Sequence, residues 1–236
     1  MSVHAHVPVS GRFSDHLWEE TKRLRTAIDD LEFLRRLGDG TLPLEVFRTY
    51  MEQDSLYLAG YAKALAILAS KSPDPQTAGF WANSSATAAT VESALHGDLL
   101  NGGQLPPREG EPEPSPACLG YVSYLTAVAA TESYAVGAAA ALPCFWIYAE
   151  VGRALAASAA QVLAADPNHP YAQWVTTYDA PEFQESASRA RELVDEAAAH
   201  AGERERAAMA TAFTVATRFE LLFWDTALNP QPWPAA

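Results

Sequence analysis

The feature that most constrains this sequence is a helical periodicity carried by a high alanine content. Alanine accounts for 46 of the 236 residues, and it is the best helix former among the amino acids. Apolar residues recur at a spacing of about 3.6 from Ser14 to the end of the last expected helix, and no segment alternates with the period of two that is typical of a strand. The sequence therefore predicts an all-α fold.

The helices are expected to number about seven or eight and to form a single domain. With 49% hydrophobic residues, the chain is long enough to bury one sizeable core. Gly137 and Pro143 interrupt one long helical pattern, which predicts either two helices or one broken helix there. The expected helices cover residues 14–36, 43–71, 76–100, 117–165 with that interruption, 171–177, 181–200 and 203–227.

Three segments fall outside these helices. Residues 1–12 are expected to form a flexible N-terminal arm, and residues 229–236, with three prolines, an extended tail. Residues 101–116 carry five prolines and three glutamates, which is typical of a solvated acidic loop. The helical domain itself is then predicted to span residues 13–228.

Composition excludes several classes of partner. Lys and Arg total 16 against 29 for Asp and Glu, a net charge of −13 that repels nucleic acid. No apolar run approaches the roughly 18 residues of a membrane span, so no membrane association is expected. The arm lacks the apolar region of a secretory signal, and the two cysteines, Cys118 and Cys144, cannot form a disulfide framework. We therefore expect a cytoplasmic protein.

Two carboxylates share a helix face with aromatic residues. Asp54 lies four residues after Tyr50 and three before Tyr57, and Glu220 lies seven after Phe213 and three before Phe223. One interpretation is that each carboxylate only bonds a neighbouring hydroxyl and stabilises packing. Because burying a carboxylate is costly, two of them on different helices favour a shared polar pocket instead.

Cys144 has two interpretations as well. A lone cysteine is more often a small buried hydrophobic residue than a nucleophile. The preceding Pro143, however, frees a backbone carbonyl within a helical pattern, and such irregularities can occur at sites. No metal site is expected: the Glu-x-x-His repeats of di-iron bundles are absent, and His4 and His6 lie in the arm.

Several short segments of the sequence match one known family in the same order and at similar spacing, which is more specific than a match of any single motif. Across about residues 13–227, the chain resembles the TenA/thiaminase II family, within the heme-oxygenase-like all-helical group. The matching segments are Gly-Asp-Gly-Thr-Leu-Pro (38–43), Gln-Asp-Ser (53–55) with Tyr57, Ala-Leu-His (94–96), Leu-Pro-Cys-Phe-Trp-Ile-Tyr (142–148) with Glu-Val-Gly (150–152), Asp-Pro-Asn-His-Pro (166–170), residues 174–178, and Phe-Glu (219–220) with Phe-Trp (223–224). Leu56 departs from close relatives, in which a tyrosine is expected, so substrate preference stays open.

The resemblance implies a cofactor-free hydrolase that acts on aminopyrimidines and thiamin. The product would be 4-amino-5-hydroxymethyl-2-methylpyrimidine, salvaged for thiamin synthesis, and the assembly a homotetramer. Cys144 would be the nucleophile of the Cys-bearing branch, Glu220 the acid/base group, and Asp54 a contact to the amino edge of the pyrimidine that helps orient the thiol. The remaining positions expected to bind substrate are aromatic: Tyr57, Tyr121, Tyr148, Tyr178, Phe223 and Phe47.

The chemistry suits these residue types. A thiolate that adds to the ring carbon, with a ring nitrogen protonated by Glu220, lets the amine leave; water then adds and the thiol departs. Two alternatives remain. One is a protein that binds thiamin or its pyrimidine without turnover. The other is a di-iron oxidase of the same helical group, although its His-x3-Asp-x2-His run is not found in this sequence.

Overall fold

The chain is all-α, as the sequence predicts. The computed structural model describes residues 11–101, 105, 110–166, 170–231 and 233–234, except for the side chains of residues 91–101, 163, 170 and 173. This described part contains ten α-helices and no strand. The helices are α1 (Phe13–Glu20), α2 (Lys22–Asp29), α3 (Glu32–Asp39), α4 (Leu44–Lys71), α5 (Pro75–Asn101), α6 (Pro116–Thr131), α7 (Tyr134–Ala165), α8 (Pro170–Asp179), α9 (Pro181–His200) and α10 (Glu203–Leu228).

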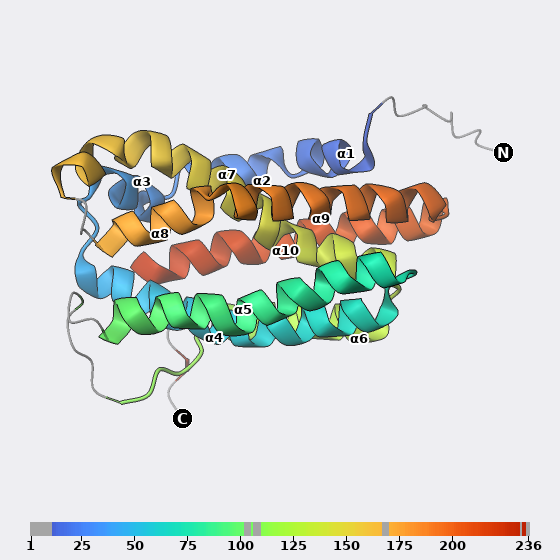
Figure 1. Ribbon diagram of the computed structural model, residues 1–236, viewed down its shortest axis with the longest axis horizontal. Coiled ribbons are helices and arrows are strands. Elements are labelled where there is room, and N and C mark those ends of the chain that lie inside the picture. The colour runs from blue at the N-terminus through green and yellow to red at the C-terminus, as the bar shows by residue number, and fades with distance from the viewer. Residues whose placement is uncertain (1–10, 102–104, 106–109, 167–169, 232, 235–236) are drawn as a thin grey trace.

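The helices form an elongated bundle around α4, α7 and α10. Helix α4 packs chiefly on α5 and α6, and α7 packs on α10, α9 and α8. Figure 1 shows the short helices α1–α3 along one side of the bundle and α4–α6 along the opposite side. In Figure 1, α5 and α9 lie on the viewer's side of the bundle, and α10 and part of α7 are seen behind them.

Helix α7 is the apolar centre of the bundle. Its segment Tyr134–Val162 is long and apolar enough to cross a membrane, with a mean hydropathy of 1.4. The expectation that no such run occurs was therefore wrong. Since 94% of its most apolar stretch is buried inside the protein, the hydropathy of this helix is accounted for by core packing.

Pro143 lies inside α7 and does not end it. The expected interruption instead falls at Glu132 and Ser133, where the Ser133 hydroxyl accepts a hydrogen bond from the Val136 amide and begins α7. A proline within a helix removes one intrahelical hydrogen bond. Near it, the Tyr61 hydroxyl of α4 donates to the Ala141 carbonyl at 2.9 Å, which ties this part of α7 to α4.

The first expected helix, 14–36, is divided into three. The Thr21 hydroxyl donates to the Leu17 carbonyl at 2.9 Å, a back-bonding pattern that bends helices. Leu31 is extended, with φ −61° and ψ 131°, and separates α2 from α3. The apolar period continues across both breaks, so periodicity alone predicts one helix where the backbone forms three.

Four side chains form a continuous stack that anchors the N-terminal helices on α7 and α9. The rings of Trp18 and Trp146 stack with centroids 3.9 Å apart. The guanidinium of Arg25 lies 3.7 Å from the Trp18 ring, and that of Arg191 lies 3.8 Å from the Trp146 ring. A cation–π contact lies at each end of the stack. The four side chains join α1, α2, α7 and α9, and Trp146 lies two residues after Cys144 in α7.

The expected arm, loop and tail lie only partly within the described residues. Residues 1–10, 102–104, 106–109, 232 and 235–236 are outside them. The end of the loop contacts α4, because the Gln53 side chain accepts from the Ser115 amide at 2.7 Å and donates to the Glu113 carbonyl at 2.9 Å. The Trp233 indole donates to the Pro114 carbonyl at 3.1 Å. The loop therefore meets α4 directly beside Asp54.

Candidate active site

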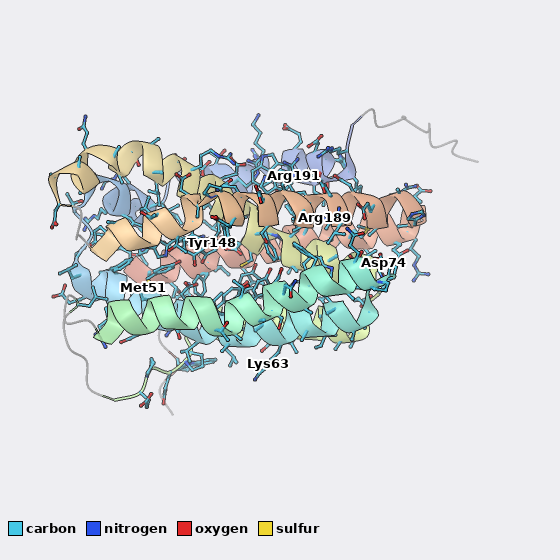
Figure 2. All side chains as sticks on the ribbon, viewed as in Figure 1. Met51, Lys63, Asp74, Tyr148, Arg189 and Arg191 are labelled. Carbon is cyan, nitrogen blue, oxygen red and sulfur yellow. The ribbon has the colours of Figure 1, made fainter. Side chains whose placement is uncertain are left out.

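A cavity of about 510 Å³ lies among α4, α5, α7, α8 and α9. Pockets that hold small ligands commonly have volumes of this order. Figure 2 shows Tyr148 between α8 and α5, and Arg189 farther along α9 toward Asp74. Both residues line the cavity. The aromatic residues of its lining are Tyr57, Tyr61, Phe80, Phe145, Tyr148, Tyr178 and Phe183.

The two cysteines have different surroundings. Cys144 is half-buried and lines the cavity from α7. Cys118 is buried beside α4, where its Sγ donates to the Gln53 carbonyl at 3.6 Å. Burial raises the pKa of Cys118 to about 12, and the Asp54 charge adds to the effect. Since the thiolate is the nucleophile, Cys118 is a poor nucleophile, and Cys144 is the thiol that faces the cavity.

Asp54 reaches the cavity from α4 although it is only 1% exposed. It lies close to a pair of phenols, Tyr50 and Tyr148, whose hydroxyl oxygens are 3.3 Å apart. Burial raises the pKa of Tyr50 well above its ordinary value, and the Asp54 charge is the second cause. The pKa of Tyr148 is likewise raised by burial first and then by its neighbours Tyr50 and Asp54. Both phenols therefore remain protonated, and they can donate hydrogen bonds at neutral pH.

Glu220 lies behind the cavity on α10, completely buried. Its Oε1 accepts a hydrogen bond from the Tyr121 hydroxyl at 2.7 Å, and its Oε2 has no hydrogen-bond partner. Burial raises the pKa of Glu220 to about 8; the Tyr121 hydrogen bond lowers it, the Asp54 charge raises it, and the Trp224 indole lowers it. A carboxyl group in this range is protonated at pH 7 and can exchange its proton near neutrality.

Two tyrosines connect Cys144 with Glu220. The rings of Tyr57 and Tyr121 are 4.9 Å apart. Burial raises the pKa of both phenols, and the charges of Cys144 and Glu220 both act on each of them. The hydroxyl of Tyr57 is buried without a hydrogen-bond partner. Tyr57, Tyr121 and Glu220 thus form a buried polar cluster behind the thiol, in which two polar atoms still have hydrogen-bonding capacity.

The site residues expected from the sequence occupy three kinds of position. Those that line the cavity are Asp54, Tyr57, Cys144, Tyr148 and Tyr178. Glu220, Tyr121 and Phe223 lie one layer behind, with the Phe223 ring 5.3 Å from the Tyr57 ring. Phe47 is not among the lining residues: it is fully buried in the core, with its ring 4.8 Å from that of Tyr171.

Several residues of the lining were not expected. Tyr61 lies on the same face of α4 as Asp54, seven residues on, so helical spacing is a signal that points to it. Phe80 from α5 and Phe183 from α9 have no comparable signal, because their helices carry no carboxylate on an apolar face. Three charged residues of α9 lie at the solvent-exposed edge of the cavity, which we call the rim: Glu182, Glu185 and Arg189. In the sequence they have the pattern of an ordinary solvated helix surface.

Within the described part of the chain, no three or more His, Cys, Asp or Glu side chains are grouped closely enough to hold a metal ion. His4 and His6 lie outside the described residues.

The chain is similar to known proteins over most of its length. Residues 25–230 match the TENA/THI-4/PQQC family. The chain is 32% identical over 223 residues to an aminopyrimidine aminohydrolase of Halalkalibacterium halodurans, covering 94% of this chain and 97% of that protein. It is 39% identical over 224 residues to the thiamine biosynthesis multifunctional protein ThiED of Corynebacterium efficiens, covering 95% of this chain. That alignment spans 29% of the relative's length.

Solved structures agree in fold. A TenA homologue from P. horikoshii OT3 superposes with a TM-score of 0.80 at 28% identity, covering 93% of this chain and 99% of that chain. A domain with a heme oxygenase-like fold from Shewanella denitrificans gives a TM-score of 0.70 at 12% identity, covering 95% and 94% of the two chains, which shows the shared fold alone. With the family match covering most of the described helices, this chain belongs to the TENA/THI-4/PQQC family.

Proposed function

We propose that this protein is an aminopyrimidine aminohydrolase of the thiaminase II type, in the Cys-bearing branch of its family. Relatives that align over most of both chains, in Bacillus subtilis and H. halodurans, are named aminopyrimidine aminohydrolases. The observation that carries the proposal is the arrangement of Cys144 in an aromatic cavity, backed by a buried carboxyl group whose pKa is raised to about 8. The reaction exchanges the amine on the exocyclic methylene for a hydroxyl, releasing ammonia.

Cys144 supplies covalent catalysis. Its Sγ forms a bond to an electron-poor ring carbon, and the displaced electron pair is taken up by the ring as a ring nitrogen gains a proton. That pair then expels the exocyclic amine, which leaves as ammonia once protonated. Water adds to the exocyclic methylene, the C–S bond breaks, and the aromatic ring and thiol are restored. No electrons are exchanged with a redox partner in any step, so no cofactor is required.

Glu220 supplies the proton. With a pKa of about 8, it carries a proton at pH 7 for the ring nitrogen and can recover one when the thiol is released. The Tyr121 hydrogen bond fixes Oε1, which leaves Oε2 as the oxygen with free hydrogen-bonding capacity. The hydroxyl of Tyr57 is buried without a hydrogen-bond partner, and the charges of both Cys144 and Glu220 act on it, so it is suited to accept or pass on that hydrogen bond.

Asp54 and the aromatic residues position the substrate. A carboxylate in the wall of the cavity can accept hydrogen bonds from the amino group of an aminopyrimidine, and the Tyr148 and Tyr178 rings, 5.1 Å apart, offer flat surfaces for a flat ring. This arrangement favours a planar, weakly basic heterocycle over an aliphatic amine.

The test is product analysis by mass spectrometry. Purified protein is incubated with 4-amino-5-aminomethyl-2-methylpyrimidine and, in parallel, with thiamin. We expect the hydroxymethyl pyrimidine from one or both substrates, with one ammonia released per product from the aminomethyl compound. Tight binding of both compounds without any product across the pH range would instead favour a non-catalytic binding protein.

Two further properties belong to the same proposal. We propose that the enzyme works in the cytoplasm, because its two cysteines form no disulfide. We also propose a homotetramer, supported by large apolar side chains exposed on neighbouring helices, Leu119 on α6 and Leu222 on α10. Light scattering after size-exclusion chromatography measures the assembly directly.

A further inference from the structure

The cavity carries carboxylates both among its buried lining residues and at its exposed rim. Its lining includes three carboxylates, those of Asp54, Glu182 and Glu185, and one basic residue, Arg189. Asp54 is buried, with 1% of its surface exposed, whereas Glu182 and Glu185 are exposed on α9. The solvent-exposed side of the cavity lining therefore carries two carboxylates.

Arg189 does not offset this charge. Its Nη1 lies 2.9 Å from Glu196 and 3.0 Å from Glu192, so the guanidinium is already paired with two carboxylates outside the cavity. Burial acts to lower the pKa of Arg189, but the two glutamates together outweigh it and hold that pKa above its ordinary value. An incoming anion would have to compete with both of them for this cation.

A second feature that could attract anions, the N-terminus of α9, is also countered. Helix α9 begins at Pro181, and residues of its first turn line the cavity. A helix N-terminus offers unpaired N–H groups and a positive end of the helix dipole, which bind phosphate well. Here Pro181 lacks an N–H group, and Glu182 places a carboxylate within that first turn. The helix end is thereby made unfavourable to a phosphate group.

The cavity has room for more than the reacting ring. A volume of about 510 Å³ is in the range of pockets that hold ligands with more than one ring. Of the lining residues, Tyr57, Tyr148 and Tyr178 are buried, whereas Asn83 and Thr87 on α5 and the two glutamates at the start of α9 are exposed, so the exposed residues mark the outer part of the cavity. A leaving group larger than ammonia would therefore extend past Glu182 and Glu185.

Building on the proposed function, we propose that Glu182 and Glu185 are specificity-determining residues that select pyrimidines with a neutral or cationic leaving group and reject phosphate esters. Opposite charges favour a cationic ring in the outer cavity, and like charges disfavour a phosphate there. Because both glutamates are exposed, the selection acts through solvent and is weakened by salt. It affects binding and kcat/KM rather than the chemical step.

The test compares thiamin with thiamin monophosphate, which have the same pyrimidine and thiazolium rings and differ only in the phosphate. We expect the wild-type protein to prefer thiamin in kcat/KM at low ionic strength. In Glu182→Gln/Glu185→Gln the preference should fall by roughly tenfold, and the difference between the two proteins should shrink in high salt. A phosphate ester used as efficiently as thiamin by the wild type would overturn the proposal.

A matched control removes the same two charges elsewhere. Glu19→Gln/Glu203→Gln changes an exposed residue of α1 and one in the first turn of α10, both outside the cavity. Its preference ratio should equal that of the wild type. If this control lowers the preference for thiamin over its phosphate as much as the rim variant does, net charge rather than the rim determines selectivity, and the proposal is wrong.

Calorimetry separates this proposal from the proposed function. Dissociation constants of both compounds are measured with Cys144→Ser, alone and combined with the rim substitutions. If nothing is turned over by the wild type, the hydrolase proposal fails. Charge selection still holds if thiamin binds more tightly than its phosphate and the rim substitutions reduce that difference. Equal affinities, or binding of neither compound, would overturn it.

Discussion

Tyr121 donates its hydroxyl hydrogen to Glu220 Oε1 at 2.7 Å, linking α6 to α10 at the base of the bundle. This contact fixes one oxygen of a fully buried carboxyl group and leaves the other, Oε2, without a partner. It also opposes the effect of burial on the pKa of Glu220, which is still raised to about 8. The hydrogen bond therefore sets both the orientation and the proton affinity of the proposed acid.

Replacing Tyr121 by phenylalanine should make Glu220 less acidic. The hydrogen bond lowers the pKa of Glu220, so its loss raises that pKa further, and the alkaline decline of kcat/KM should move to higher pH. We also expect activity at neutral pH to fall by about tenfold, because Glu220 is no longer held in one orientation. The pH–rate profile measures both effects, and an unchanged alkaline limb would contradict this role for Tyr121.

Replacing Glu220 by glutamine should change the pH dependence of stability. The pKa of Glu220 is about 8 in the folded protein, higher than the ordinary glutamate value of 4.5. The folded state therefore binds the proton more tightly, so this group's contribution to stability is fully present below pH 4.5 and is lost as pH rises to about 8. Wild-type protein should become less stable across that range, and Glu220→Gln should lose less. Chemical denaturation at several pH values measures the difference; parallel curves for both proteins would disagree with it.

The same Glu220→Gln substitution should reduce turnover by a factor of about 10² to 10⁴, the usual contribution of a general acid–base group. An amide keeps the size of the side chain and an oxygen for Tyr121, so the fold is preserved. If the variant is correctly folded by circular dichroism and its kcat is near normal, Glu220 is not the general acid–base group.

Gly152 allows α7 to approach the end of α8 closely, so a side chain at this position should destabilise the protein. A Cβ at this position would lie 2.8 Å from the backbone carbonyl carbon and oxygen of Tyr178. We expect Gly152→Ala to destabilise the protein by about 1–3 kcal/mol and to raise KM, since Tyr178 lines the cavity. Gly79→Ala in α5 is the matched control: a Cβ there meets nothing within 4 Å. That change should be neutral or stabilising by up to about 1 kcal/mol. Denaturant midpoints and KM values for both variants provide the comparison.

The sequence predicts most of the helices because their signals are local. Helix α9 was expected at 181–200 and begins at Pro181, a residue preorganised for the first helical position. The division of 14–36 could not be predicted, since the Thr21 back-bond and the extended Leu31 leave the apolar period intact. Pro143 was expected to mark a break, yet the surrounding helix is so deeply buried that packing preserves it.

The candidate site was predictable where a residue conflicts with its surroundings. Asp54 and Glu220 are carboxylates on apolar faces, and the structure buries both. Phe47 lies on the same stripe as Asp54, but it packs within the core, because helical spacing does not indicate which part of a face reaches a cavity. The rim glutamates on α9 were not predictable, since an exposed carboxylate there conflicts with nothing in its own helix.

The most direct measurement of the covalent mechanism is turnover of the aminomethyl pyrimidine by two cysteine variants, followed as ammonia release and product mass. Cys144→Ser should lose at least about a thousandfold in kcat, because serine is a far weaker nucleophile at neutral pH. Cys118→Ser, which changes a buried thiol outside the cavity, should retain activity within about twofold once its folding is confirmed. Full activity of Cys144→Ser would contradict the central claim that this thiol adds to the substrate ring.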